Sequence, residues 1–77
     1  MKLNEMKENN SASITRIHGT AEFQRRITSV GLTIGSEVEM IQNDKHNPIM
    51  MYVRNTTLAM NRRDGANIEV EEIRNGR

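Results

Sequence analysis

The side chains best able to carry chemistry are few in this 77-residue chain. Its two histidines, His18 and His46, fall in different predicted connections, and it has no cysteine. Neither histidine has the converging partners that hold zinc or iron, and no nucleophile elbow, phosphate-binding loop or zinc-protease motif occurs. His46, between Asp44 and Asn47, is either an adventitious cation ligand or a solvated loop residue. The pattern favours the solvated residue, so we predict no enzyme, no metal site and no cofactor.

Two pairs of arginines, Arg25/Arg26 and Arg62/Arg63, would suit a phosphate backbone. A nucleic-acid groove usually adds aromatic side chains for stacking, and only Tyr52 is available for that role in this chain. The alternative is a solvated rim of arginines, which the net charge of +1 favours because it provides no global field to attract a polyanion. We therefore expect no nucleic-acid partner.

Length and composition limit the architecture. The chain has room for one small domain over residues 1–77. It contains no stretch near the roughly 20 apolar residues that cross a bilayer, and residues 1–10 lack the apolar segment of a signal peptide. We expect a cytoplasmic protein that is not inserted in a membrane and is a monomer or a weak oligomer.

A short helix positions the first arginine pair. Thr20 is a good N-cap, and Gly31 can adopt the left-handed conformation that ends a helix. Phe23, Ile27 and Val30 share one face, which we expect to be structural and to pack on the core.

The two arginines of that helix have different surroundings. Arg26 lies beside the apolar face, four residues after Glu22, whereas Arg25 lies on the opposite side. Beyond the helix, residues 33–36 fit a turn in which Gly35 supplies a positive φ, and Leu32 can fold back on the last helical turn.

Short β-forming segments make up the rest of the chain. Ile14 and Ile17 are three residues apart, so a bulge or bend is needed to return both to the core. Small antiparallel sheets leave open edges unless they curl. We therefore predict a mainly β, five-stranded SH3-like barrel with one short helix between the first two strands, plugged by that helix. The predicted strands span residues 11–18, 37–41, 49–54, 57–60 and 66–73.

Both ends of the chain are polar. Residues 1–10 are polar apart from Leu3 and Met6, and two interpretations are open: these side chains cover one end of the core, or the segment is a frayed terminus. We expect loose order in residues 1–10 and 74–77.

The ordered motifs resemble the ferrous iron transport protein A family, FeoA. The resemblance runs from Leu3 to Val70 and departs from the family pattern in three places. The family usually has a glycine near Asn10, often a proline at Ile34, and usually a glycine at Asn55. The matching pattern is Ile14-x-x-Ile17-x-Gly19, Arg25-Arg26-Ile27-x-x-Val30-Gly31-Leu32-x-x-Gly35-x-x-Val38, Pro48-Ile49-x-x-Tyr52-Val53, and Leu58-Ala59-Met60 with Ala66-x-Ile68-x-Val70.

The resemblance implies a non-enzymatic accessory protein of bacterial Fe(II) uptake. Its partner would be FeoB, a membrane transporter with a cytoplasmic GTPase domain. Family members are often described as linked to transition metals, although this chain shows no ligand set. We assign partner contact to Arg25 and to the corner that contains Gly31, Leu32 and Gly35, and a structural ion pair at the barrel rim to Arg26.

A second function remains open at this point. Related domains occur at the C-terminus of iron-dependent repressors, so the chain could be a metal-responsive regulatory domain. The sequence predicts no recognition helix, which argues against DNA binding by this domain alone.

Overall fold

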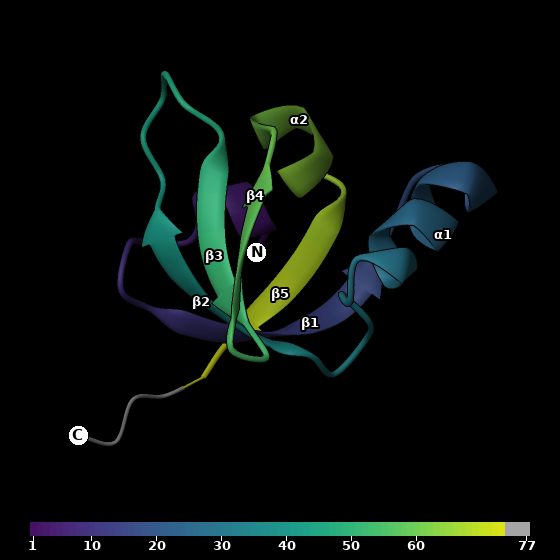
Figure 1. Ribbon diagram of the computed structural model, residues 1–77, viewed down its shortest axis with the longest axis horizontal. Coiled ribbons are helices and arrows are strands. Elements are labelled where there is room, and N and C mark those ends of the chain that lie inside the picture. Colours follow the sequence, from purple (N-terminus) through teal and green to yellow (C-terminus); the bar gives the residue numbers. More distant parts are fainter. Residues whose placement is uncertain (74–77) are drawn as a thin grey trace.

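The computed structural model describes residues 1–73, so the predicted loose order of residues 74–77 lies outside the described part. Five antiparallel strands form one sheet in the order β4-β3-β2-β1-β5, which curves around a core (Figure 1). This confirms the mainly β class and the helix between the first two strands. The elements are η1 (Leu3–Glu5), β1 (Ser11–Ile17), α1 (Ala21–Ser29), β2 (Glu37–Gln42), β3 (Ile49–Val53), β4 (Thr56–Met60), α2 (Arg62–Gly65) and β5 (Ile68–Glu72).

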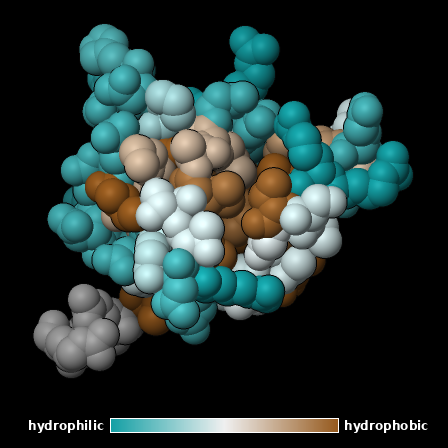
Figure 2. Space-filling view, viewed as in Figure 1, coloured by the Kyte–Doolittle hydropathy of each residue, from teal (hydrophilic) through white to brown (hydrophobic). Residues whose placement is uncertain are grey.

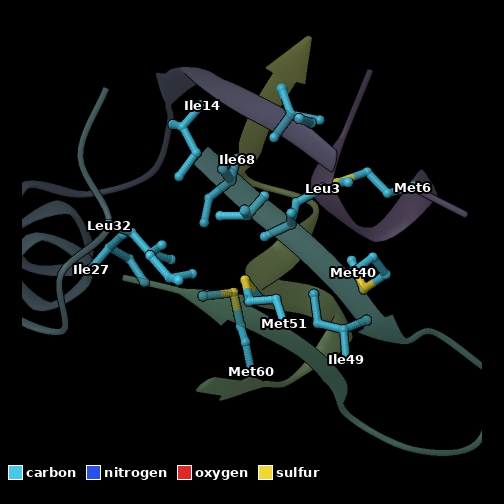
Figure 3. Close-up of a cluster of buried hydrophobic side chains, with 14 residues drawn as sticks. Leu3, Met6, Ile14, Ile27, Leu32, Met40, Ile49, Met51, Met60 and Ile68 are labelled. Carbon is cyan, nitrogen blue, oxygen red and sulfur yellow. The ribbon is translucent and has the colours of Figure 1, made fainter. Parts of the chain in front are cut away.

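The alternation of side chains along the strands sets the core. Inward residues of β2, β3 and β5 are buried, as their period of two requires. The pairing of β1 with β5 shifts between Ile14 and Arg16, which is the expected bulge; Ile14 is buried and Ile17 half-buried. The buried cluster (Figure 3) consists of Leu3, Met6, Ala12, Ile14, Ile27, Leu32, Val38, Met40, Ile49, Met51, Val53, Met60, Ile68 and Val70.

Helix α1 begins and ends as its sequence predicts. The Thr20 hydroxyl accepts a hydrogen bond from the Phe23 N–H at 3.0 Å. At the other end Gly31 has a φ of 105°, and its N–H donates to the Thr28 carbonyl at 3.0 Å. The Leu32 N–H donates to the Ile27 carbonyl at 3.2 Å, which completes a Schellman motif.

One residue of the helix face that we predicted to fill the barrel is wrong. Ile27 is buried and Phe23 half-buried, but Val30 is 49% exposed. Val30 is the C-cap residue, with φ −86° and ψ 0°, so the helical period no longer fixes the direction of its side chain. Leu32, after the left-handed Gly31, is fully buried in its place.

The N-terminal segment covers the core, and the predicted loose order of residues 1–10 is corrected. Leu3 and Met6 are both buried and point into the cluster (Figure 3). The strand entry near Asn10 is ordered as well. Asn9 adopts the positive φ of 72° for which a glycine would be suited, and its N–H donates to the Met40 carbonyl at 2.7 Å.

Arg62 holds this segment in place, so it does not belong to a solvated rim. Its guanidinium donates to the Asn43 side-chain oxygen, to the Asp44 carbonyl at 2.8 Å and to the Asn4 carbonyl at 3.3 Å. The Asn43 amide in turn donates to the carbonyls of Asn4 at 3.1 Å and Met6 at 2.6 Å. Arg63, its neighbour, is exposed.

The Gly31 conformation gives a test of the α1 end. A β-carbon built there meets no atom within 4 Å, so a substitution acts through the backbone and not through a clash with neighbours. Gly31→Val should cost about 1–3 kcal/mol because a β-branched residue is strained at positive φ. That corresponds to about 4–8 °C in melting temperature per kcal/mol for a domain of this size. Gly31→Asn should cost less, and equal melting temperatures for both variants would show that positive φ is not required.

Candidate functional site

A groove separates α1 from the edge of the barrel. Its volume is about 250 Å³, below the range of about 300–1,000 Å³ typical of small-molecule pockets. The space-filling view shows an apolar patch in the region between β4 and α1 (Figure 2). Its lining residues are Arg26, Ile27, Val30, Leu58, Ala59, Met60, Asn61 and Asp64.

An ion pair closes one end of this groove. Arg26 Nη2 lies 3.1 Å from Asp64 Oδ2, so the pair joins α1 to α2. The Arg26 guanidinium carbon also lies 5.4 Å from the centre of the Phe23 ring, a cation–π distance. The rim partner of Arg26 is thus Asp64, from a distant part of the chain, and not Glu22 on the same helix.

Arg25 points away from the groove, on the outer side of α1. Its side chain is exposed, and it makes no ion pair within residues 1–73. It borders a shallow depression with Ala21, Gln24, Thr28 and Ser29. The side chain is therefore free to contact a partner.

The corner after α1 differs from the prediction in one residue. Leu32 is fully buried, so its assignment to partner contact is wrong; its side chain belongs to the core. Exposed apolar side chains lie on either side of it: Val30 at 49% and Ile34 at 67%. Gly31 and Gly35 both have open space where a β-carbon would stand, so the backbone of this corner is accessible.

Sequence patterns alone missed the β4 wall of the groove. The alternation of β4 directs Leu58 and Met60 toward the core, and Met60 is buried, but Leu58 is only half-buried and also lines the groove with Ala59. The missed signal is the composition of residues 56–60, which contain no charged residue although they form an edge strand.

The two histidines occupy separate surroundings. His18 Nε2 lies against Glu69 Oε2, and this hydrogen bond lowers the pKa of Glu69 below its ordinary value of 4.5. In the β2–β3 loop, the Asn47 amide and the His46 N–H donate to Asp44, which lowers the pKa of that carboxyl. No group of three or more histidines, cysteines or carboxylates is placed to hold a metal ion within residues 1–73.

The His18–Glu69 pair predicts a pH effect. A carboxyl whose pKa is lower in the folded state stabilises the fold above its unfolded pKa, and this contribution disappears as the pH falls below about 4.5. His18→Ala should therefore raise the pKa of Glu69 toward 4.5, measured by NMR titration of the side-chain carboxyl. His46→Ala is the matched control and should leave the Glu69 titration unchanged. An unchanged Glu69 pKa in His18→Ala would assign the lowering to another cause.

The sequence matches known proteins over nearly its full length. The model of the FeoA domain matches residues 1–72. The chain is also 30% identical over 74 residues to the Fe(2+) transport protein A/Fe(2+) transporter FeoB fusion protein of Porphyromonas gingivalis. That match covers 95% of this chain but only 9% of the relative, so this chain corresponds to a small part of the fused protein.

Solved structures share the fold. An iron uptake regulatory protein (FeoA) has a TM-score of 0.90 at 20% identity, covering 95% of this chain and 97% of that one. Stenotrophomonas maltophilia FeoA, solved with zinc and described as an SH3 domain protein, has a TM-score of 0.75 at 24% identity, covering 92% and 89%. A manganese-dependent transcriptional repressor has a TM-score of 0.86 at 15% identity, covering 95% and 41%.

These structures confirm the SH3-like fold. Because the FeoA model matches residues 1–72 of the 77, this chain belongs to the FeoA family.

Proposed function

We propose that this chain is a non-enzymatic, cytoplasmic accessory protein of bacterial ferrous iron uptake that docks on the cytoplasmic part of an FeoB-type membrane transporter. The observation that carries the proposal is the fused relative, in which transport protein A and transporter FeoB form one polypeptide. Fusion keeps two domains at a high effective concentration, which promotes contacts that separate chains must form by diffusion.

The docking surface that we propose includes α1 and the corner after it. Arg25 offers a charge that has no ion-pair partner within residues 1–73. In the corner, Gly31 and Gly35 have open space where a β-carbon would stand, and the neighbouring side chains of Val30 and Ile34 are exposed. A charge for steering beside apolar area for affinity is the combination that transient protein interfaces use. No helix within residues 1–73 is long and apolar enough to cross a bilayer, so we place this protein beside the transporter and not in the membrane.

The repressor-like structure supports a second candidate, a metal-responsive regulatory domain. At 15% identity that likeness concerns the fold alone. The helices of residues 1–73 are the nine-residue α1 and the one-turn pieces η1 and α2, which do not form a helix-turn-helix for reading a DNA groove. Docking on the transporter is therefore the function that we favour.

Iron would be the transported cargo and not a resident cofactor of this protein. Fe(II) sites commonly combine two histidines with a carboxylate, and in this structure His18 pairs with Glu69 while His46 lies in another loop. We predict that the isolated, metal-free protein binds Fe(II) weakly or not at all in anaerobic calorimetry. A stoichiometric site of micromolar affinity or better would contradict this prediction.

The charge of Arg25 gives the test of docking. Arg25→Glu should leave the melting temperature nearly unchanged, because an exposed charge without a partner contributes little to folding. Charge reversal at an interface slows association, so its affinity for the transporter's cytoplasmic domain should fall at least tenfold, about 1.4 kcal/mol. The measurement is calorimetric titration of the purified domain with each variant.

Lys45→Glu is the matched control for this experiment. It makes the same reversal at an exposed residue of the β2–β3 loop, which Figure 1 shows at the far side of the barrel from α1. We expect this variant to bind like the parent protein. Equal binding by Arg25→Glu and the parent would remove Arg25 from the contact surface.

A further inference from the structure

The two edges of the sheet differ in whether another segment of the chain pairs with them. At the β5 edge, Lys2 forms a β-bridge with Glu69, and the Val70 N–H donates to the Met1 carbonyl at 2.7 Å. The N-terminal segment therefore pairs with that edge. Strand β4 is paired with β3 on one side only, and its other side has no backbone partner within residues 1–73.

The register identifies the unpaired backbone groups. Strands β3 and β4 are joined by the two-residue turn Arg54–Asn55, with φ values of 51° and 65°, and Val53 faces Thr56 across it. In such a hairpin the closing pair is hydrogen-bonded, and bonding alternates along the strand. Thr57 and Ala59 therefore direct their N–H and C=O groups away from β3. Both residues are exposed, so α1 does not cover this edge.

This edge lacks the features that natural proteins use to prevent pairing. Exposed edge strands are commonly protected by lysine or other charges, by proline or by a bulge. The β4 sequence, Thr-Thr-Leu-Ala-Met, contains no charged residue and no proline, and its pairing with β3 is regular over all five residues. An unprotected edge of this kind is a template for an added strand.

The residues that line the groove beside β4 limit which segments can bind there as an added strand. Ile27 and Val30 of α1 form the wall opposite Leu58 and Ala59, so an added strand would place alternate side chains on an apolar surface. Arg63 lies in sequence between the lining residues Asn61 and Asp64, is exposed, and makes no ion pair within residues 1–73. This unpaired charge beside the groove favours a segment that also bears carboxylates. A second copy would instead bring a whole barrel and another basic helix against α1.

We infer that the β4 edge binds an extended, apolar segment with flanking acidic residues from the transporter's cytoplasmic part, as an added antiparallel or parallel strand. This inference rests on the proposed function and adds the β4 edge to the proposed docking surface. Backbone hydrogen bonds from Thr57 and Ala59 supply affinity, and the groove residues select alternate side chains.

The test removes one backbone N–H group from the unpaired side of β4 and keeps the strand itself. Ala59→Pro deletes an N–H that points away from β3, a position at which a strand tolerates proline. Ala59→Val is the matched control, because it keeps the N–H and a β-forming side chain. In calorimetry with the transporter's cytoplasmic domain, we expect Ala59→Pro to bind at least tenfold more weakly and Ala59→Val to bind within about threefold of the parent protein.

Hydrogen exchange gives an independent measurement on the unaltered protein. The amides of Thr57 and Ala59 should exchange more slowly in the complex than in the free protein. If the parent protein binds, while Ala59→Pro binds equally well and these amides gain no protection, strand addition is overturned and docking stands. If the parent protein does not bind the domain at all, both proposals fall. If Ala59→Pro does not fold, the exchange of the two amides decides alone.

Discussion

The Arg62 guanidinium is the contact on which the covered end of the core depends. It joins the η1 segment, the β2–β3 loop and the turn α2, which come from distant parts of the sequence. A core this small supplies only a few kcal/mol, so an uncovered end would expose a large share of its apolar area. By fixing Asn4 and Asn43, Arg62 keeps Leu3 and Met6 over that end. Gly65 adds to the fit, since a β-carbon there would lie 2.9 Å from Ile49 Cδ1.

That closure also makes the molecule asymmetric. The N-terminal segment that covers the core continues onto the β5 edge, so one edge of the sheet is occupied by the chain itself. On the other side, α1 is attached through Ile27, the turn to Leu32 and the Arg26–Asp64 pair, and it projects beyond the barrel (Figure 1). A groove results between a firmly paired sheet and a helix held by few contacts. Surfaces with few buried contacts adjust most readily to a partner.

Local patterns predict the elements well and their assembly less well. Alternation fixes the inward residues of the strands, and Thr20 and Gly31 mark the ends of α1, because both effects act within a few residues. The helical period fails at Val30, since a C-cap residue leaves the helix; the left-handed Gly31 then directs Leu32 inward. The role of Arg62 was not predictable either, because its acceptors come from positions far away in the sequence.

The candidate site is also predictable from the sequence only in part. The exposure of Arg25 follows from its side of the helix, and the open corner follows from two glycines, so both could be predicted. The free edge could not, because whether a strand is an edge depends on the order of strands in space and on which neighbour covers it. In this protein the N-terminal segment pairs with the β5 edge of the sheet and leaves the β4 edge unpaired. The residues near Thr57 and Ala59 in the sequence do not indicate which edge is paired. Its uncharged composition becomes informative only once the strand order is known. A site built from backbone groups also needs no particular side chain for its hydrogen bonds, which is why an inspection of histidines, carboxylates and arginines does not find it.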